Sequence, residues 1–123
     1  MTQIKQEWNA IPKFCQGYFE AMLASEDDLG NAGFYQLPRE AFDKSISDCL
    51  KFQKMVATPL MMALAGSYDS AQAGMDFYLT RNGHGAGFWD RGLGVIGEEL
   101  TTICKTHFKP VEPYLGDDGL IYL

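Results

Sequence analysis

The chain has 123 residues, of which 46% are hydrophobic and 13% aromatic, and it carries a formal net charge of −6 at pH 7. This composition predicts one globular domain over residues 1–123 and excludes a disordered or fibrous chain. The negative charge argues against a nucleic-acid partner bound by neutralising phosphates. The chain shows no apolar run of membrane-spanning length and no pattern typical of a secretory signal, so we expect a cytoplasmic protein with no membrane partner.

The cysteines and histidines do not form a pattern typical of a metal or redox site. Cys15, Cys49 and Cys104 are widely spaced and include no Cys-x-x-Cys pair, so we interpret them as buried free thiols. His84 and His107 are far apart and lack a neighbouring ligand at metal-binding spacing. We therefore expect no metal and no cofactor.

The first half of the chain predicts two helices. Apolar residues from Ile4 to Met22 recur at helical spacing, and Pro12 is placed to begin a helix over about 12–24. Gly30-Asn31-Ala32-Gly33 is a loop by composition, and Pro38 then begins a second helix. The buried stripe of this second helix is predicted to be Phe42, Ile46, Cys49, Leu50 and Val56.

The middle of the chain combines turn signals with short helical patterns. Pro59 favours a short third helix over 60–65, which Gly66 would end in a left-handed conformation. Asp69 is placed to cap one further helical turn over 70–73.

Residues 75–80 differ from the helical segments before them. Their sequence, Met-Asp-Phe-Tyr-Leu-Thr, contains aromatic and β-branched side chains and favours a strand. A last, long helix is expected from about 88 to 106. It contains Gly92, Gly94 and Gly97, which weaken a helix, so we expect this helix to press closely on another backbone.

The end of the chain predicts a β-hairpin over 111–122, because two β-prone runs flank the turn sequence Gly116-Asp117-Asp118-Gly119. The predicted fold class is therefore α+β. The helical N-terminal two-thirds would pack on a small antiparallel sheet, formed by strand 75–80 and hairpin 111–122, together with the long helix of about 88–106.

The candidate functional site is the segment 74–97, which contains seven of the thirteen glycines. Such a cluster usually marks positive φ angles or a close approach by another group. Between these glycines stand the candidate binding residues, Arg81, Asn82, His84, Trp89, Asp90 and Arg91.

The chemistry of these residues leaves several interpretations open. His84 and Asp90 are the best candidates for catalysis, as an acid–base pair beside an arginine that stabilises an anion. In the structural alternative, which we favour, the histidine ring holds the loop through a hydrogen bond and Asp90 caps a helix or pairs with an arginine. Asp76, His84 and Asp90 could also meet at a divalent ion, but their spacing does not indicate one.

The aromatic residues of this segment have two possible uses, packing in the core or contact with a partner. We expect Phe77 and Phe88 in the core and take Trp89 as the residue to test for binding.

Two blocks of the sequence resemble a group of small proteins of tailed bacteriophages that has no assigned activity. The first is Asp-Phe-Tyr-Leu-Thr-Arg-Asn-Gly-His-Gly-Ala-Gly-Phe-Trp-Asp-Arg-Gly, from Asp76 to Gly92. The second is the closing pattern Tyr114-x-Gly-Asp-Asp-Gly-x-x-Tyr122. The resemblance covers roughly the last fifty residues and is loose before them. It implies a phage protein acting in the cytoplasm of an infected bacterium, and it transfers no catalytic residue.

Two functions from different classes follow as hypotheses. The first is a small acidic phage accessory protein that binds and modulates or inhibits a host protein, for example a defence protein. The second is a small hydrolase that acts on a phosphorylated or nucleotide-like metabolite through the glycine-rich loop. Whether the chain is an enzyme is left open, with binding favoured, and single-stranded nucleic acid is the least favoured partner because of the charge.

Oligomeric state is also open, since Met55, Met61 and Met62 suit either an adaptable interface or core filling.

Overall fold

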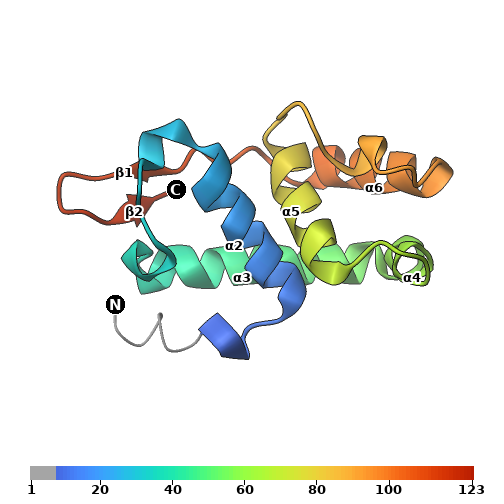
Figure 1. Ribbon diagram of the computed structural model, residues 1–123, viewed down its shortest axis with the longest axis horizontal. Coiled ribbons are helices and arrows are strands. Elements are labelled where there is room, and N and C mark those ends of the chain that lie inside the picture. Colours follow the sequence, from blue (N-terminus) through green and yellow to red (C-terminus); the bar gives the residue numbers. More distant parts are fainter. Residues whose placement is uncertain (1–7) are drawn as a thin grey trace.

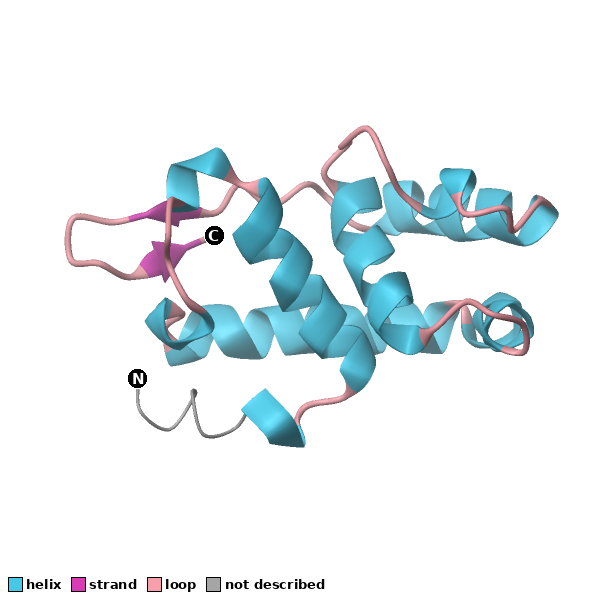
Figure 2. Cartoon of the chain, in the orientation of Figure 1, coloured by secondary structure: helices cyan, strands magenta, loops and turns pink. Residues whose placement is uncertain are grey.

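The computed structural model describes residues 8–123, which are mainly helical (Figures 1 and 2). Along these residues the α-helices are α2 (Lys13–Ser25), α3 (Arg39–Met55), α4 (Ala57–Leu64), α5 (Ser70–Arg81) and α6 (Val95–His107). Short 3₁₀ helices are η1 (Trp8–Ala10), η2 (Asp27–Leu29), η3 (Phe34–Gln36) and η4 (Phe88–Asp90). The strands are β1 (Tyr114–Leu115) and β2 (Ile121–Tyr122), which pair antiparallel with Tyr114 opposite Tyr122.

Much of the predicted organisation is confirmed in outline. Helices α2 and α3 follow Pro12 and Pro38 directly, and the C-terminal hairpin turns at the predicted glycine and aspartate residues. The start of the predicted N-terminal stripe, Ile4, lies outside the described residues. Mixed α and β structure is present, but the described part of the chain is far more helical than the predicted α+β fold.

The predicted strand 75–80 is wrong, because these residues belong to α5. The helix has strong signals at both ends. The side chain of Asp69 accepts a hydrogen bond from the Gln72 N–H (2.7 Å), which caps the first turn. After the last turn, Gly83 (φ +70°) and His84 donate their N–H groups to carbonyls of α5 at 3.2 and 3.0 Å. This is the Schellman arrangement that ends many helices, and it outweighs the local β propensity.

The predicted long helix 88–106 is also wrong in its first part. Residues 88–90 form the separate turn η4, and Gly92 and Gly94 have φ of +71° and +62°, which a regular helix excludes. Helix α6 therefore begins only at Val95. Gly97 alone fits the predicted close contact, since a Cβ there would lie 2.7 Å from the Phe88 carbonyl oxygen.

Two smaller predictions are corrected as well. Gly66 does not have the positive φ of a left-handed cap, and α4 ends instead with its last carbonyls accepting from the following backbone amides. Leu50 of α3 is 52% exposed and so does not belong to the buried stripe of that helix.

Helices α2 and α5 cross at a close backbone contact, and the two lie side by side in front of α3 (Figure 1). At the crossing, a Cβ on Gly17 would collide with the carbonyl oxygen of Ala71. A Cβ on Gly74 would collide in the same way with the carbonyl oxygen of Phe14. The two glycines therefore let the helices approach until backbone meets backbone.

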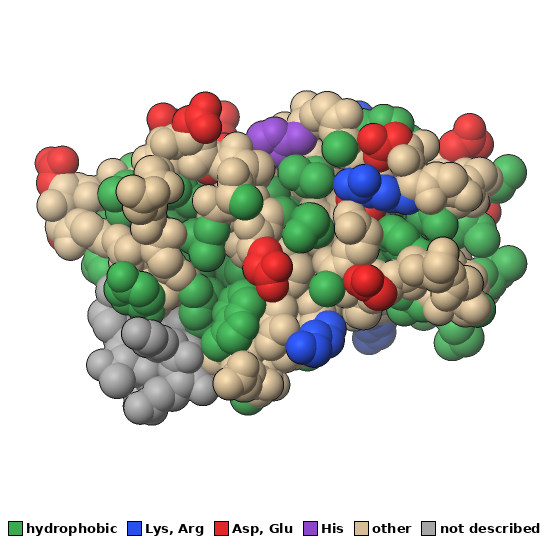
Figure 3. Space-filling view, viewed as in Figure 1, with side chains coloured by type: hydrophobic (Ala, Val, Ile, Leu, Met, Phe, Trp, Pro, Cys, Tyr) green, Lys and Arg blue, Asp and Glu red, His purple; other side chains and the backbone are tan. Residues whose placement is uncertain are grey.

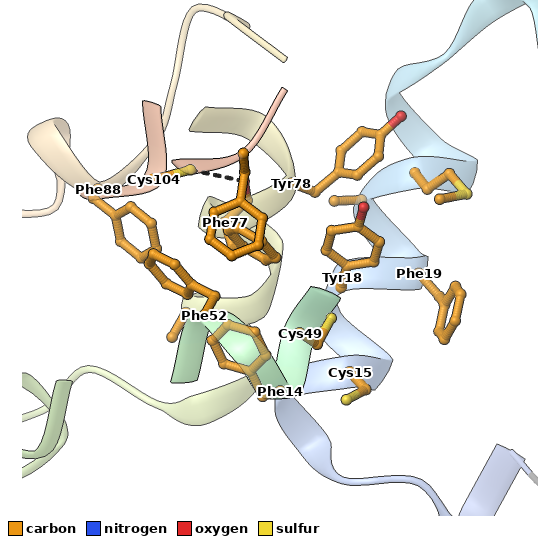
Figure 4. Packing of buried hydrophobic residues seen from close by; sticks show 14 of the residues in the cluster. Phe14, Cys15, Tyr18, Phe19, Cys49, Phe52, Phe77, Tyr78, Phe88 and Cys104 are labelled. Atoms are coloured by element: carbon orange, nitrogen blue, oxygen red, sulfur yellow. Dashed lines mark hydrogen bonds between the residues drawn. The ribbon is translucent and has the colours of Figure 1, made fainter. Parts of the chain in front are cut away.

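Aromatic rings fill the space around this crossing (Figure 4). Phe77 lies at the centre, with its ring stacked on Phe52 (4.3 Å between centroids, 8° between planes) and edge-on to Phe108 (5.0 Å). Tyr18 and Phe14 of α2 pack against the same ring at 5.4 and 6.0 Å. Phe77 and Phe88 are fully buried, as expected from the sequence.

The other elements are arranged around this core. Helix α6 packs on α5, η4 and α4, while β1 of the hairpin packs on η2. Figure 1 shows that the hairpin lies at one end of the molecule and that α4, with the start of α6, lies at the other.

The crossing of α2 and α5 predicts that Gly74→Ala lowers the free energy of unfolding by about 1–3 kcal/mol, the usual cost of overpacking a core. The added methyl meets a main-chain carbonyl, which cannot move without shifting α2. Chemical denaturation followed by circular dichroism measures the change.

Gly66→Ala is the matched control, because a Cβ there has only one neighbour within 4 Å, the Ala63 carbonyl oxygen at 3.7 Å. We expect this variant to stay within about 0.5 kcal/mol of the parent chain. Equal stability of the two variants would contradict the described crossing.

Candidate functional site

Arg81 lies inside the protein at the end of α5 and is fully engaged. Its Nε and Nη2 donate to the carbonyl oxygen of Lys109 at 2.9 and 2.6 Å. Its Nη1 donates to Asp48 Oδ2 (2.9 Å) and to the Tyr18 hydroxyl (3.2 Å). Burial alone would lower the pKa of Arg81, but Tyr18 and Asp48 raise it above its ordinary value. This guanidinium therefore remains charged and joins α2, α3 and the segment after α6.

Asn82, the next residue, also connects the end of α5 to the segment after α6. Its Oδ1 accepts a hydrogen bond from the Val111 N–H (2.7 Å), and its Nδ2 donates to the Tyr78 carbonyl oxygen (3.0 Å). Both groups of the amide are thus used to fix the segment that follows α6 against the end of α5.

Arg91 forms a forked ion pair with Asp76 of α5. Its Nε lies 3.0 and 3.1 Å from the two carboxylate oxygens, and its Nη2 lies 2.9 Å from Oδ1. The Asp76 side chain is completely buried, and it also accepts from the Tyr68 hydroxyl (2.6 Å) and from Gln72 Nε2 (3.1 Å). Such a paired and hydrogen-bonded charge is the form in which a carboxylate is tolerated in a protein interior.

Asp90 closes the turn that precedes it. Its Oδ1 accepts the Gly87 N–H at 3.1 Å and lies 3.9 Å from Arg91 Nε. The structural alternative had Asp90 cap a helix or pair with an arginine. In the structure Asp90 caps the short turn η4 and lies near Arg91, and neither contact involves His84.

His84 pairs with an acidic residue from a distant part of the chain. Its Nε2 lies 3.3 Å from Glu26 Oε2, and its ring lies over the ring of Tyr78 with 6.2 Å between centroids. The Tyr78 hydroxyl donates to the same Glu26 oxygen at 2.5 Å. Burial raises the pKa of Tyr78, and the hydrogen bond to Glu26 raises it further, so the phenol remains a donor at neutral pH.

Trp89 is exposed to solvent over 43% of its surface. The edge of its ring lies against Gly87, where a Cβ would collide with the indole. The Lys105 ammonium group lies 5.6 Å from the ring centroid, within cation–π range. The indole is therefore held in one place although nearly half of it is accessible.

The structure does not bring the six candidate residues together. Asn82 and His84 line a pocket of about 460 Å³ with Glu26, Asp28 and Glu112. Arg81 borders a second hollow of about 700 Å³ between α3 and the hairpin. Asp90, Arg91 and Trp89 line neither of these two pockets.

This distribution bears on the hydrolase hypothesis, which requires the arginines, Asn82, His84 and Asp90 to face one cavity. Arg81 and Arg91 are instead directed to different carboxylates, Asp48 and Asp76. The pocket that His84 does line contains three carboxylates, and these would repel a phosphorylated substrate.

Residues that sequence reasoning missed are the acidic partners Asp48, Asp76 and Glu26. From the sequence, Asp76 was considered only as one of three residues that could meet at a divalent ion. A signal for Asp76 was present, since residues 69 and 83 mark the two ends of a helix. On that helix Asp76 lies one turn from both Gln72 and Thr80, on a buried side.

Residues 8–123 contain neither a cluster of metal ligands nor a helix that could span a membrane. No group of three or more His, Cys, Asp or Glu side chains there could hold a metal ion. None of the helices in this range is both long and apolar enough to cross a membrane. Comparisons with protein-family models, with curated proteins and with solved structures likewise gave no match.

The buried ion pair predicts that Arg91→Ala lowers the free energy of unfolding by about 3–5 kcal/mol, because it leaves the Asp76 carboxylate buried without its countercharge. Thermal and chemical denaturation measure the loss.

Arg39→Ala is a matched control, since Arg39 pairs with Asp43 in an exposed i,i+4 contact at 3.6 Å. Removal of such a pair is expected to cost less than about 1 kcal/mol. If Arg91→Ala were as stable as Arg39→Ala, the structural role of Arg91 would be refuted.

Proposed function

We propose that this chain is a small acidic accessory protein of a bacteriophage that binds a host protein in the bacterial cytoplasm and modulates or inhibits it. We further propose that Trp89 is the centre of the contact surface. The observation that carries the proposal is the exposed indole of Trp89, which packs against Gly87 and Lys105. Its neighbours Asp90 and Arg91 instead have partners within the chain.

The setting of Trp89 suits a binding residue. Phe88 before it is fully buried, and Asp90 after it is tied to Gly87, so the backbone on both sides is anchored. An aromatic ring that is already ordered loses little conformational entropy when a partner covers it. Tryptophan is also among the residues that most often dominate the energy of a protein–protein contact.

The surface around Trp89 has the composition of a contact region. Lys105 lies over the ring and the exposed carboxylate of Asp90 stands next to it, so an apolar centre has a polar rim. The chain as a whole carries a net charge of −6, and this field favours encounter with a basic protein surface.

The test is capture of a partner from bacterial lysate by the immobilised chain, with quantitative mass spectrometry of what is bound. We expect a stoichiometric host protein, and we expect Trp89→Ala to weaken its binding by about 30-fold or more, the size of a hot-spot effect. Isothermal titration calorimetry with the purified partner measures the change.

Leu50→Ala is the matched control, because Leu50 is an apolar side chain of similar exposure on α3, and it should leave the affinity unchanged. The affinity of His84→Ala for the partner tests whether the acidic pocket, which His84 lines, also takes part in binding. Undiminished binding by Trp89→Ala, or the absence of any stoichiometric partner in lysates of several hosts, would refute the proposal.

A further inference from the structure

Helix α4 is apolar on every side. None of its eight residues is charged, and the uncharged run extends from Met55 to Tyr68. Leu60 and Ala63 face the core and are buried. A helix that is hydrophobic all round is normally covered all round, whereas a single copy of this chain covers α4 on one side alone.

The uncovered side forms a continuous stripe. Ala57, Met61 and Ala65 are spaced four residues apart, as are Thr58 and Met62, so all five lie on one helix face. Met61 is 70% exposed and Met62 is 59% exposed. We call these five residues the α4 stripe, in which two long flexible side chains stand between small ones.

The apolar surface continues beyond α4. Helix α4 packs against α6, and Val95 at the start of α6 is also strongly exposed. Figure 3 shows several hydrophobic side chains, with other side chains and acidic groups between them, at the end of the molecule where Figure 1 places α4 and the start of α6. Several large apolar side chains exposed at one end of a protein are typical of a surface that contacts another macromolecule.

We propose that the α4 stripe is the contact surface of a two-fold homodimer, in which α4 packs antiparallel on α4 of a second copy. The charges at the two ends of the uncharged run support this occupant. Exposed Lys54 precedes the run and exposed Asp69 follows it. An antiparallel arrangement brings Lys54 of each copy toward Asp69 of the other, so that two attractive pairs flank the apolar centre.

The net charge favours the same face. Two copies that each carry −6 repel one another. This repulsion is weaker at a contact whose centre, the α4 stripe, holds no carboxylate and whose flanking Asp69 faces Lys54 of the other copy. A two-fold interface must also be self-complementary. Met61, in the middle of the stripe, would meet its own copy near the symmetry axis, and methionine adapts its shape to such a contact.

The homodimer predicts that the native chain has twice the mass of one chain in sedimentation equilibrium and that the mass falls on dilution. Met62→Lys should raise the dimer dissociation constant by about 100-fold or more, because each interface then buries two unpaired charges. Met62 is exposed in the single chain, so circular dichroism and the melting of the monomer should be unchanged. Leu115→Lys, on the hairpin at the opposite end, is the matched control and should leave the dissociation constant as it is.

A cysteine at the centre of the stripe tests the geometry. In Met61→Cys, glutathione disulfide should oxidise the two facing thiols to one interchain disulfide and be reduced to two molecules of glutathione. The native cysteines are fully buried, so the new thiol would be the accessible one. Leu115→Cys is the control and should form the covalent dimer far more slowly.

Three results would overturn the homodimer. These are the mass of one chain at every concentration, a dimer that Met62→Lys leaves intact, and equal rates of cross-linking for Met61→Cys and Leu115→Cys. Trp89→Ala lies outside the stripe and should dimerise normally, so failure of the homodimer is separable from failure of the proposed host contact.

Discussion

The contact between the backbones of α2 and α5 is the constraint on which the rest of the structure depends. Gly17 and Gly74 remove the side chains that would hold the two helices apart. The close approach brings the rings of Tyr18 and Phe77 to 5.4 Å from each other. It also places the end of α5 beside α3, where Arg81 reaches Asp48. A larger separation would open the aromatic core and draw Arg81 away from Asp48.

Polar residues of the glycine-rich segment then stabilise what the helices have brought together. Arg81 and Arg91 each satisfy a carboxylate that lies wholly or mostly inside the protein, Asp48 and Asp76. Because a buried charge is costly without a partner, the fold requires these two ion pairs. Trp89 differs from these two arginines, because its exposed side chain does not pair with a buried charge. That difference is the physical basis of the proposal that Trp89 contacts a partner.

The sequence predicted the N-terminal helices and the hairpin well, because proline starts and a Gly-Asp-Asp-Gly turn are local signals. Residues 75–80 were predicted wrongly for a reason that can be seen in α5. This helix is buried on most of its circumference, so the alternation of polar and apolar residues that reveals a surface helix is missing. The remaining signals of a helix lie at its two ends, where Asp69 caps the first turn and Gly83 adopts a left-handed conformation after the last.

The partners of the candidate site residues could not be predicted in the same way. His84 meets Glu26, and Arg81 meets Asp48, across separations of 58 and 33 residues. Such pairs exist only after tertiary packing, and no local pattern encodes them. Composition and spacing indicated the segment correctly as unusual, but they could not distinguish side chains that hold the fold from side chains that face a partner.

The segment between α6 and the hairpin is held through its main chain. Arg81 binds the carbonyl of Lys109, Asn82 binds the amide of Val111, and Gln36 binds the carbonyl of Gly119 at 2.9 Å. Every amino acid supplies a carbonyl, and every one except proline supplies an amide hydrogen. The side chain of Lys109 is exposed, so this position can accept other residues in natural variation or directed evolution while Arg81 keeps its hydrogen bonds to the main chain. Val111 is more restricted, because its side chain also packs against the core.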